Sequence, residues 1–421
     1  MNRIFQIVRT KKVLFKNFTS LSILQLSNYV FPLITLPYLV RILGPEKYGL
    51  VNFASAFVMY FAILTDYGFN LSATQDISVN AKDDKKISLI FSAVVIIKLF
   101  FYLIASILFL VIIYLFPQFQ EIPILFIVSF LGVLGSTIFP IWFYQGIEKM
   151  HYILGINVFV RSFLTVSIFI IIKKENDFLL FVVLNSIANI LTGLLGLLFA
   201  IIKLKVKFCK PSFDFLKEQV VKGWSLFLST LWTNLYTTSN VFILGLFAPN
   251  NVVGYYAAAD KVRMAFQGIL SPVTQSVFPY VNKLLAESYN KFINFNKKLL
   301  KIGVLIGLLI SVFLFTFAST ISHLILGNEY QQSIVVLKII AWLPLIIIVS
   351  NVLGIQTMIP LNRDKSFSLI LFFAAVINII ISLIIVPKYF EIGTSISVLI
   401  TEFFVSTAFL IYVKKNKIKV I

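Results

Sequence analysis

The stretch from Val94 to Phe116 reads VVIIKLFFYLIASILFLVIIYLF and contains Lys98 as its one charged residue. A helix that crosses the hydrocarbon core of a membrane needs about 20 mostly apolar residues. The stretch lacks the alternation of apolar and polar residues that strands of a transmembrane barrel show. Because backbone groups in lipid must be hydrogen-bonded within the protein, only helices or closed barrels can span the bilayer. The stretch is therefore typical of a transmembrane helix.

Similar stretches recur along the whole chain of 421 residues, and together they predict an all-α polytopic membrane protein with twelve transmembrane helices. The composition agrees, because 59% of the residues are hydrophobic and 13% are charged, whereas soluble domains carry roughly 25% charged residues. The predicted spans are 19–43, 49–76, 87–116, 122–145, 152–172, 178–202, 224–246, 254–279, 299–317, 334–356, 367–386 and 394–413.

The distribution of basic residues predicts the orientation of these helices. With the N-terminus inside, 26 Lys and Arg residues fall in cytoplasmic segments and five fall on the opposite side. Cytoplasmic loops of membrane proteins are enriched in Lys and Arg, so both termini are expected in the cytoplasm. The predicted parts are an amphipathic N-terminal segment (1–18), a first lobe (19–202), a cytoplasmic linker (203–223), a second lobe (224–413) and a cytoplasmic tail (414–421).

The two predicted lobes contain a faint internal repeat. The segment Arg41–Gly49, which opens the second span, resembles Leu244–Gly254, which opens the eighth, with one extra residue in the latter. Because each lobe has an even number of helices, both lobes enter the membrane in the same direction. Parallel repeats of this kind are typical of transporters, so we predict two pseudo-symmetric six-helix lobes.

The composition also excludes several classes of site and partner. The net charge of +19 suggests a nucleic-acid partner at first. The excess of basic residues lies in the cytoplasmic segments, however, where we expect it to set the orientation of the helices and to contact anionic lipids. A single cysteine, Cys209, excludes an intrachain disulfide, and His151 and His323 lie far apart in the sequence. No phosphate-binding G-x-x-x-x-G-K-[ST] loop is present. We therefore expect no metal, no cofactor and no nucleic-acid partner.

Polar residues inside the eighth span form a stripe. They are spaced by three or four residues and fall within about 80° of one helical face. The stripe comprises Asp260, Arg263, Gln267, Ser271 and Thr274, with Lys261 beside it. One interpretation is the wall of a hydrated cavity, and the other is an ion pair between Asp260 and Arg263 that neutralises itself.

The second span carries a comparable polar face, and other spans carry isolated charges. Ionisable residues inside spans cost at least a few kcal/mol each and suggest function. The face comprises Asn52, Ser55, Asp66, Asn70 and Thr74; further charges inside spans are Arg161 and Glu402. For Lys98, Asp76 and Lys338 we expect that the side chain reaches the membrane surface, as long side chains near helix ends do.

Several segments together resemble a known family. The segments are Ser27–Gly49, Asp66–Ile77, Gly254–Arg263, Leu270–Pro279 and Val386–Gly393. The resemblance is to Wzx-type (RfbX) O-antigen and polysaccharide flippases of the MOP, or MATE-like, superfamily, and it extends over essentially the whole chain. Gln75 replaces the basic residue usual near the end of the second helix, which leaves the role of that position open.

The resemblance implies a MATE-like fold in the bacterial inner membrane and a substrate consisting of an undecaprenyl-diphosphate-linked oligosaccharide. It implies that Arg263 and Lys261 attract the diphosphate, with Arg41 and Arg161 as weaker candidates. Gln267 and the Asn and Ser groups of the polar faces would line the path, while Asp66, Asp260 or Glu402 would carry protons or cations. The polymerase and glycosyltransferases of the same pathway are the implied protein partners.

Two alternatives remain open from the sequence. The first is a cation-coupled small-molecule exporter of the same superfamily, which would also have two lobes and buried carboxylates. The second is a membrane enzyme that polymerises or ligates the same glycans, for which a long periplasmic loop with acidic and basic residues is expected. The longest outward loops of this chain hold only about 10–16 residues, a length that argues against an extracytoplasmic active site.

Overall fold

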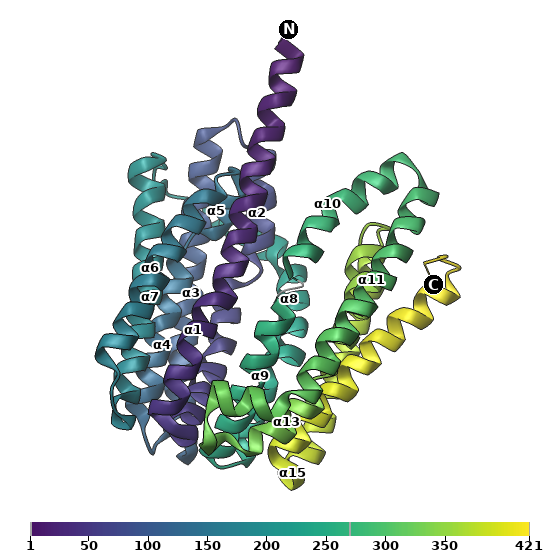
Figure 1. The fold of residues 1–421 in the computed structure, drawn as a ribbon. Helices are drawn as coiled ribbons and strands as arrows, with labels where there is room; N and C mark the ends of the chain where they lie inside the picture. The colour runs from purple at the N-terminus through teal and green to yellow at the C-terminus, as the bar shows by residue number, and fades with distance from the viewer. Residues whose placement is uncertain (1, 269–270, 421) are drawn as a thin grey trace. The chain divides into compact units, whose positions relative to one another are not determined.

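The computed structural model describes the backbone of residues 2–268 and 271–420, and the side chains within these ranges except residues 2–18, 21, 22, 225, 229, 271–273, 275, 276 and 279. The described residues form helices joined by short turns and include no strand (Figure 1). The predicted all-α class is therefore confirmed. The amphipathic pattern predicted for 1–18 lies outside the described side chains, as does Ser271 of the eighth-span stripe.

The chain folds as two compact units that are not continuous in sequence. The first unit contains the chain up to Phe31 together with Ala54–Leu231, and the second contains Pro32–Phe53 together with the chain from Trp232 onward. Two long helices, α1 (Asn2–Asp66) and α8 (Phe213–Phe247), therefore contribute to both units. The division into lobes 19–202 and 224–413 stays a prediction about how the chain is arranged in the membrane.

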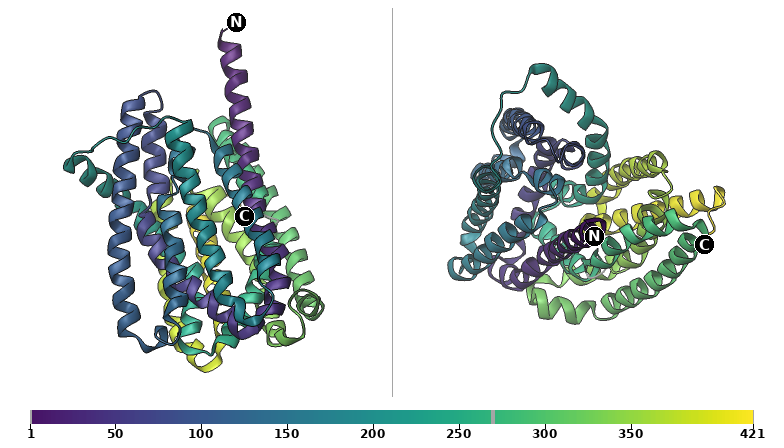
Figure 2. Two further views of the ribbon diagram at one scale, coloured as in Figure 1. Left: turned by 90° about the vertical axis from the view of Figure 1, so that its left-hand side faces the viewer. Right: turned by 90° about the horizontal axis from the view of Figure 1, so that it is seen from above.

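The first unit is a bundle of long helices, several of which are seen nearly end-on from above in Figure 2. Its further helices are α2 (Phe69–Val79), α3 (Asp84–Leu115), α4 (Pro123–Ile138), α5 (Ile141–Gly146), α6 (Met150–Ile171), α7 (Phe178–Leu198) and the π-helix η3 (Phe199–Lys203), with short 3-10 turns at η1 (Pro117–Phe119) and η2 (Glu175–Asp177). Small residues allow α4 and α7 to pack closely, since a Cβ at Gly193 would overlap the Gly135 carbonyl oxygen. Close approach at small residues is how helices associate in lipid.

The second unit has the same all-helical construction. Its helices are the rest of α8, α9 (Asn250–Gly268), α10 (Ser271–Glu287), α11 (Tyr289–Thr316), α12 (Ala318–Ile321), α13 (Gln332–Ile340), α14 (Leu343–Ser350) and α15 (Asp364–Lys415), with π-helices η4 (Ser322–Leu326) and η6 (Asn351–Met358) and a 3-10 turn η5 (Asn328–Tyr330). Ile418 and Val420 of the C-terminal segment are buried in a cluster with Val281 and Phe292. The end of the described chain thus belongs to the hydrophobic core of this unit.

Eight stretches of the described chain are long and apolar enough to cross a membrane, and two of them are more than twice the length that one crossing needs. These two are Ile23–Val79, which is interrupted at Gly44, and Asp364–Lys415, which is interrupted at Phe390. Both interruptions fall between predicted spans. The predicted spans 224–246 and 254–279 are helical where described but are not among the eight. The chain is a multi-pass membrane protein, and these observations are consistent with twelve helices.

Aromatic side chains fill one part of the first unit. The Phe57 ring stacks on Phe119 at a centroid distance of 4.5 Å, and the Phe109 ring stacks on Phe130 at 4.2 Å. Phe61 contacts both Phe109 and Phe130 edge to face. Aromatic pairs in such geometries contribute about 0.5–1.5 kcal/mol each beyond burial, so this cluster joins α1, α3, α4 and the turn η1 into one core.

A contact between two glycines holds the middle of α1, which belongs to the second unit, against α9. A Cβ at Gly49 would overlap the Asn250 carbonyl oxygen, and a Cβ at Gly254 would overlap the Pro45 carbonyl oxygen. These glycines are the residues that the internal repeat aligns with each other. The equivalent turns of the repeat therefore pack directly together within the second unit, and the absence of side chains at both positions makes that approach possible.

We predict that Gly49→Ala destabilises the protein, because even one methyl group overlaps backbone that cannot move aside. Overpacking of this kind typically costs about 1–3 kcal/mol. Thermal unfolding of the purified protein in detergent would measure the lower Tm. Gly155→Ala in α6 is the matched control, since a Cβ there meets no atom within 4 Å. Equal loss of Tm in both variants would contradict the packing argument.

Candidate functional site

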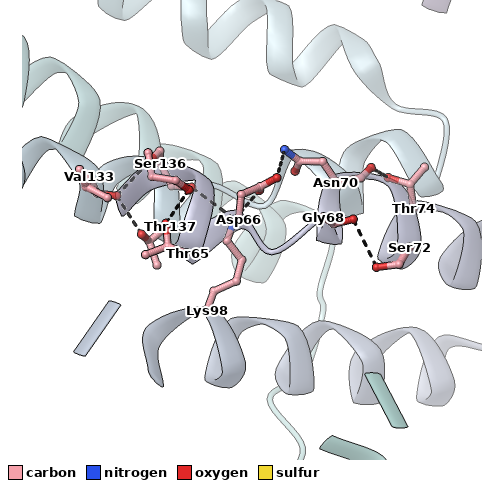
Figure 3. A network of polar contacts seen from close by, with 11 residues as sticks. Thr65, Asp66, Gly68, Asn70, Ser72, Thr74, Lys98, Val133, Ser136 and Thr137 are labelled. Atoms are coloured by element: carbon pink, nitrogen blue, oxygen red, sulfur yellow. Dashed lines mark hydrogen bonds and ion pairs between the residues drawn. The ribbon is translucent and has the colours of Figure 1, made fainter. Parts of the chain in front are cut away.

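The polar site of the first unit lies where α1 ends. Asp66 is the last residue of α1, and Tyr67 and Gly68 have positive φ values of 48° and 74° before α2 begins at Phe69. The left-handed conformation ends one helix and starts the next within two residues. Figure 3 shows the Asp66 carboxylate at this break, between Asn70 of α2 and Lys98 of α3.

Lys98 joins two interrupted helices. Its Nζ lies 3.3 Å from Asp66 Oδ1 and donates to the Ser136 carbonyl oxygen at 3.4 Å. Ser136 lies in the last turn of α4, which ends at Ile138. Carbonyl groups at helix C-termini carry partial negative charge, so the ammonium stabilises the end of α4, and it neutralises the carboxylate at the end of α1.

The expectation that Lys98 reaches the membrane surface is wrong. The residue is 2% exposed and forms an ion pair inside the first unit. Its position gave the relevant signal, because it lies eleven residues inside the predicted span 87–116, or about 16 Å along a helix. A lysine at that depth requires a partner within the protein.

The second-span residues beyond Asp66 form a connected chain of hydrogen bonds. Asn70 Nδ2 donates to Asp66 Oδ2 at 3.0 Å, and the Thr74 hydroxyl lies 2.7 Å from the Asn70 carbonyl oxygen and 3.2 Å from the Trp142 carbonyl oxygen. These bonds connect α1, α2 and α5. Ser55 is exposed in the first unit, whereas Asn52 belongs to the second unit and donates to the Tyr48 carbonyl oxygen at 2.7 Å.

Asp76 at the far end of α2 binds the start of α8. Its Oδ2 accepts from Gln219 Nε2 at 3.0 Å and from Lys222 Nζ at 3.2 Å. The Glu218 carboxylate, aided by Asp76 and opposed by desolvation, raises the pKa of Lys222. Asp76 therefore fixes the segment in which the chain passes from the linker into α8.

The polar site of the second unit lies on α9. Arg263 Nη2 and Nε both lie 2.7 Å from Asp260 Oδ1, and Nη1 donates to Gln267 Oε1. The structure therefore confirms the ion pair that the i,i+3 spacing suggests. Because Arg263 is buried and uses its nitrogens on two neighbours of its own helix, its charge is largely neutralised by Asp260.

Glu402 of α15 is a further acid of the second unit, on a helix that packs against α9. It is buried, and the positive charge that acts on its carboxylate is that of Arg263. Residues 139 positions apart in sequence are thus brought together by the packing of α15 against α9. Neither the sequence of α9 nor that of α15 alone indicates that the two helices are neighbours.

The remaining predicted cations differ in their partners. Exposed Arg41 donates to the carbonyl oxygen of Leu324 in the middle of η4. Exposed Lys261 and partly buried Arg161 form no hydrogen bond or ion pair with any described residue. Arg161 lies on the face of α6 opposite its exposed apolar stripe, which consists of Phe159, Phe163, Val166 and Ile170. Its charge is therefore directed away from the surface that contacts lipid.

A buried hydrogen-bonded cluster in the second unit was not predicted from the sequence. Asn378 Nδ2 of α15 donates to Asn240 Oδ1 of α8 at 3.3 Å and to Thr401 Oγ1 at 3.2 Å, and the Ser239 hydroxyl donates to Asn378 Oδ1 at 3.4 Å. All four residues are buried. The signal was an asparagine in the centre of the apolar span 367–386. Among the described residues, no three His, Cys, Asp or Glu side chains are grouped to hold a metal.

Comparison with known proteins agrees with this architecture. Residues 14–285 match the family described as polysaccharide biosynthesis protein. The chain belongs to this family. An Escherichia coli (strain K12) protein named "Putative O-antigen transporter" is 34% identical over 96% of this chain and 98% of its own length.

Two solved structures share the fold of this polysaccharide biosynthesis protein. The lipid II flippase MurJ in an inward closed conformation matches with a TM-score of 0.77 and 14% identity, over 96% of this chain and 87% of that one. An inward-facing multidrug resistance MATE family transporter of the MOP superfamily matches with a TM-score of 0.70 and 16% identity, over 94% and 98%. The predicted MATE-like fold is confirmed.

We predict that Lys98→Met destabilises the protein strongly, because it leaves the partly buried Asp66 carboxylate without its counter-charge. Breaking a buried ion pair costs about 3–5 kcal/mol, whereas replacing both partners is often neutral. The double variant Asp66→Asn/Lys98→Met should therefore regain much of the lost Tm. Size-exclusion chromatography of heated detergent extracts would measure this. A double variant no more stable than Lys98→Met would show that the pair itself is not responsible.

Proposed function

We propose that this protein is a flippase for undecaprenyl-diphosphate-linked O-antigen or capsule repeat units. It moves them from the cytoplasmic to the periplasmic leaflet by alternating access, and it performs transport rather than catalysis. The observation that carries this proposal is the end-to-end similarity to the O-antigen transporter homologue of Escherichia coli. The flippase fold of MurJ supports the same class of substrate.

The buried charges give the proposal a physical basis. A diphosphate and a glycan cannot cross about 30 Å of hydrocarbon unaided, so the protein must offer cations and hydrogen-bonding groups. Arg161 and Lys261 have no acidic partner among the described residues, and we assign them to the diphosphate. Arg263, which is paired with Asp260, acts mainly in organising α9.

Ion coupling is part of the proposal. Asp66, Asp260 and Glu402 are the carboxylates of the predicted path, and each lies inside a membrane-embedded unit. Intramembrane carboxylates are the usual carriers of coupling protons or cations.

We place the protein in the bacterial inner membrane with both termini in the cytoplasm, as the distribution of Lys and Arg indicates. Its protein partners would be the polymerase and glycosyltransferases that act on the same lipid-linked glycan. These assignments follow from the proposed substrate, which must be built on the cytoplasmic side before transport.

The MATE-like fold favours a second candidate, a cation-coupled exporter of small molecules. Deletion of the gene distinguishes the two. A flippase deletion should cause undecaprenyl-linked repeat units to accumulate in the cytoplasmic leaflet and surface polysaccharide to disappear. In a strain with no redundant flippase, normal surface polysaccharide together with increased sensitivity to toxic cations would favour the exporter.

We predict that Arg161→Ala fails to restore surface polysaccharide to the deletion strain, because the variant removes a cation that no described acid neutralises. Immunoblotting of surface polysaccharide at matched expression is the measurement. Lys415→Ala is the control, since it removes an exposed cation at the end of α15 and should complement fully. Full complementation by both variants would contradict the assignment of Arg161 to the diphosphate.

A further inference from the structure

The first unit has an exposed surface that combines lysines with large apolar side chains and lies outside the predicted substrate path. It is formed by the linker and the beginning of α8, residues 203–224, and we call it the linker surface. Phe213 is 79% exposed, Trp224 is 52% exposed, and Phe208 is also exposed. Apolar side chains of this size, exposed together, mark a surface that contacts lipid or another molecule.

The linker is held along the beginning of α3 by hydrogen bonds from its backbone. The N–H of Lys207 donates to the Ser88 hydroxyl at 3.3 Å, and the N–H of Cys209 donates to the Ser92 hydroxyl at 2.8 Å. Both serines are buried, and Val206 is buried in the hydrophobic cluster of the first unit. The linker therefore has a defined position on the helices of this unit, and its lysines start from a fixed backbone.

The first turns of α8 have a core face and an exposed apolar face. On the core face, buried Gln219 donates to Asp76, and the Phe227 ring stacks on Tyr67 at a centroid distance of 4.9 Å. The exposed face covers about 80° of another side of the helix and comprises Phe213, Lys217, Val221 and Trp224. Seen from above, this part of α8, in teal, runs across helices of the first unit that are viewed nearly end-on (Figure 2). A helix with these features is typical of the membrane–water interface, where tryptophan is enriched.

The charge of the linker surface is predominantly positive. Its acids are Asp214 and Glu218, and Glu218 already pairs with Lys222 at 2.9 Å. Five further lysines are exposed and form no ion pair with any described residue, namely Lys203, Lys205, Lys207, Lys210 and Lys217. Lysine ammonium groups beside aromatic rings are complementary to a leaflet with anionic headgroups.

The linker surface continues the apolar outer side of the first unit. Ile202 in η3, directly before the linker, is 72% exposed. It follows the apolar span of α7, whose outer side faces lipid. This continuity favours the bilayer itself, rather than a soluble partner, as the molecule that covers the linker surface.

We propose that the linker surface binds anionic phospholipids of the leaflet on which it lies. The lysines of the linker and Lys217 contact the headgroup phosphates, while Phe213 and Trp224 insert between the headgroups and the acyl chains. Because α8 contributes to both units, this contact holds the beginning of a helix that the two units share at the membrane surface. The inference does not depend on which substrate the protein carries.

Fluorescence quenching at Cys209 tests the proposal with a reporter site that the chain already contains. Cys209 is the single cysteine and is exposed on the linker surface, so bimane attached to it reports the lipids around the linker. In nanodiscs that contain both lipids, nitroxide-labelled phosphatidylglycerol should quench bimane at about a fivefold lower mole fraction than nitroxide-labelled phosphatidylcholine. This is the ratio expected for one lysine near an anionic surface. Salt at about 1 M should remove the difference, because it screens charges beyond about 3 Å.

Two variants with equal net charge identify the lysines responsible. The linker variant Lys205→Gln/Lys207→Gln/Lys210→Gln/Lys217→Gln should lose the preference for phosphatidylglycerol. The control variant Lys414→Gln/Lys415→Gln/Lys417→Gln/Lys419→Gln removes four exposed lysines of the C-terminal segment and should keep it.

The wild-type protein decides the proposal even when a variant does not fold. Equal quenching by the two lipids in wild type would overturn the proposal, as would an unchanged preference in the folded linker variant. Quenching by aqueous iodide but by neither labelled lipid would also overturn it, and would assign the linker surface to a soluble partner instead.

Discussion

The high cost of an uncompensated charge in hydrocarbon governs how both units are built. A buried charge needs an opposite charge or a proton, because lipid supplies neither water nor counterions. In the first unit Lys98 meets Asp66 across two helices, and in the second Arg263 meets Asp260 on one helix. Glu402 is also buried in the second unit, and it forms no hydrogen bond or ion pair with any residue that the structure describes. The same constraint thus explains the ion pairs found in both units.

Interruptions of helices generate the polar groups on which these charges act. A continuous transmembrane helix satisfies its own backbone, but a broken one leaves carbonyl oxygens free at the break. Lys98 uses one such oxygen at Ser136 in the last turn of α4, and it also pairs with the side-chain carboxylate of Asp66 where α1 ends. Unwound or broken segments near polar sites are characteristic of transporters. The first unit therefore obtains a cation site from backbone geometry as much as from side chains.

The sequence predicted much of this architecture. The apolar stretches fix the all-helical class, and the breaks at Gly44 and Phe390 fall between predicted spans. The spacing of the polar residues predicted the polar stripe on α9, because residues three or four positions apart share a helical face. The prediction for Lys98 was wrong: its depth in the span indicated that it needs a partner within the protein, but spacing along one helix does not identify an acid on another. The hydrogen-bonded cluster around Asn378 was missed for the same reason.

By itself, the sequence determined the helical class, the polar faces and the pairing of Asp260 with Arg263, since each depends on periodicity within one segment. Only the tertiary structure decided that Lys98 pairs with Asp66 and that Gly49 meets Gly254. These contacts join residues from different helices. Which helices become neighbours depends on the packing of whole surfaces, and no local pattern of residues encodes it.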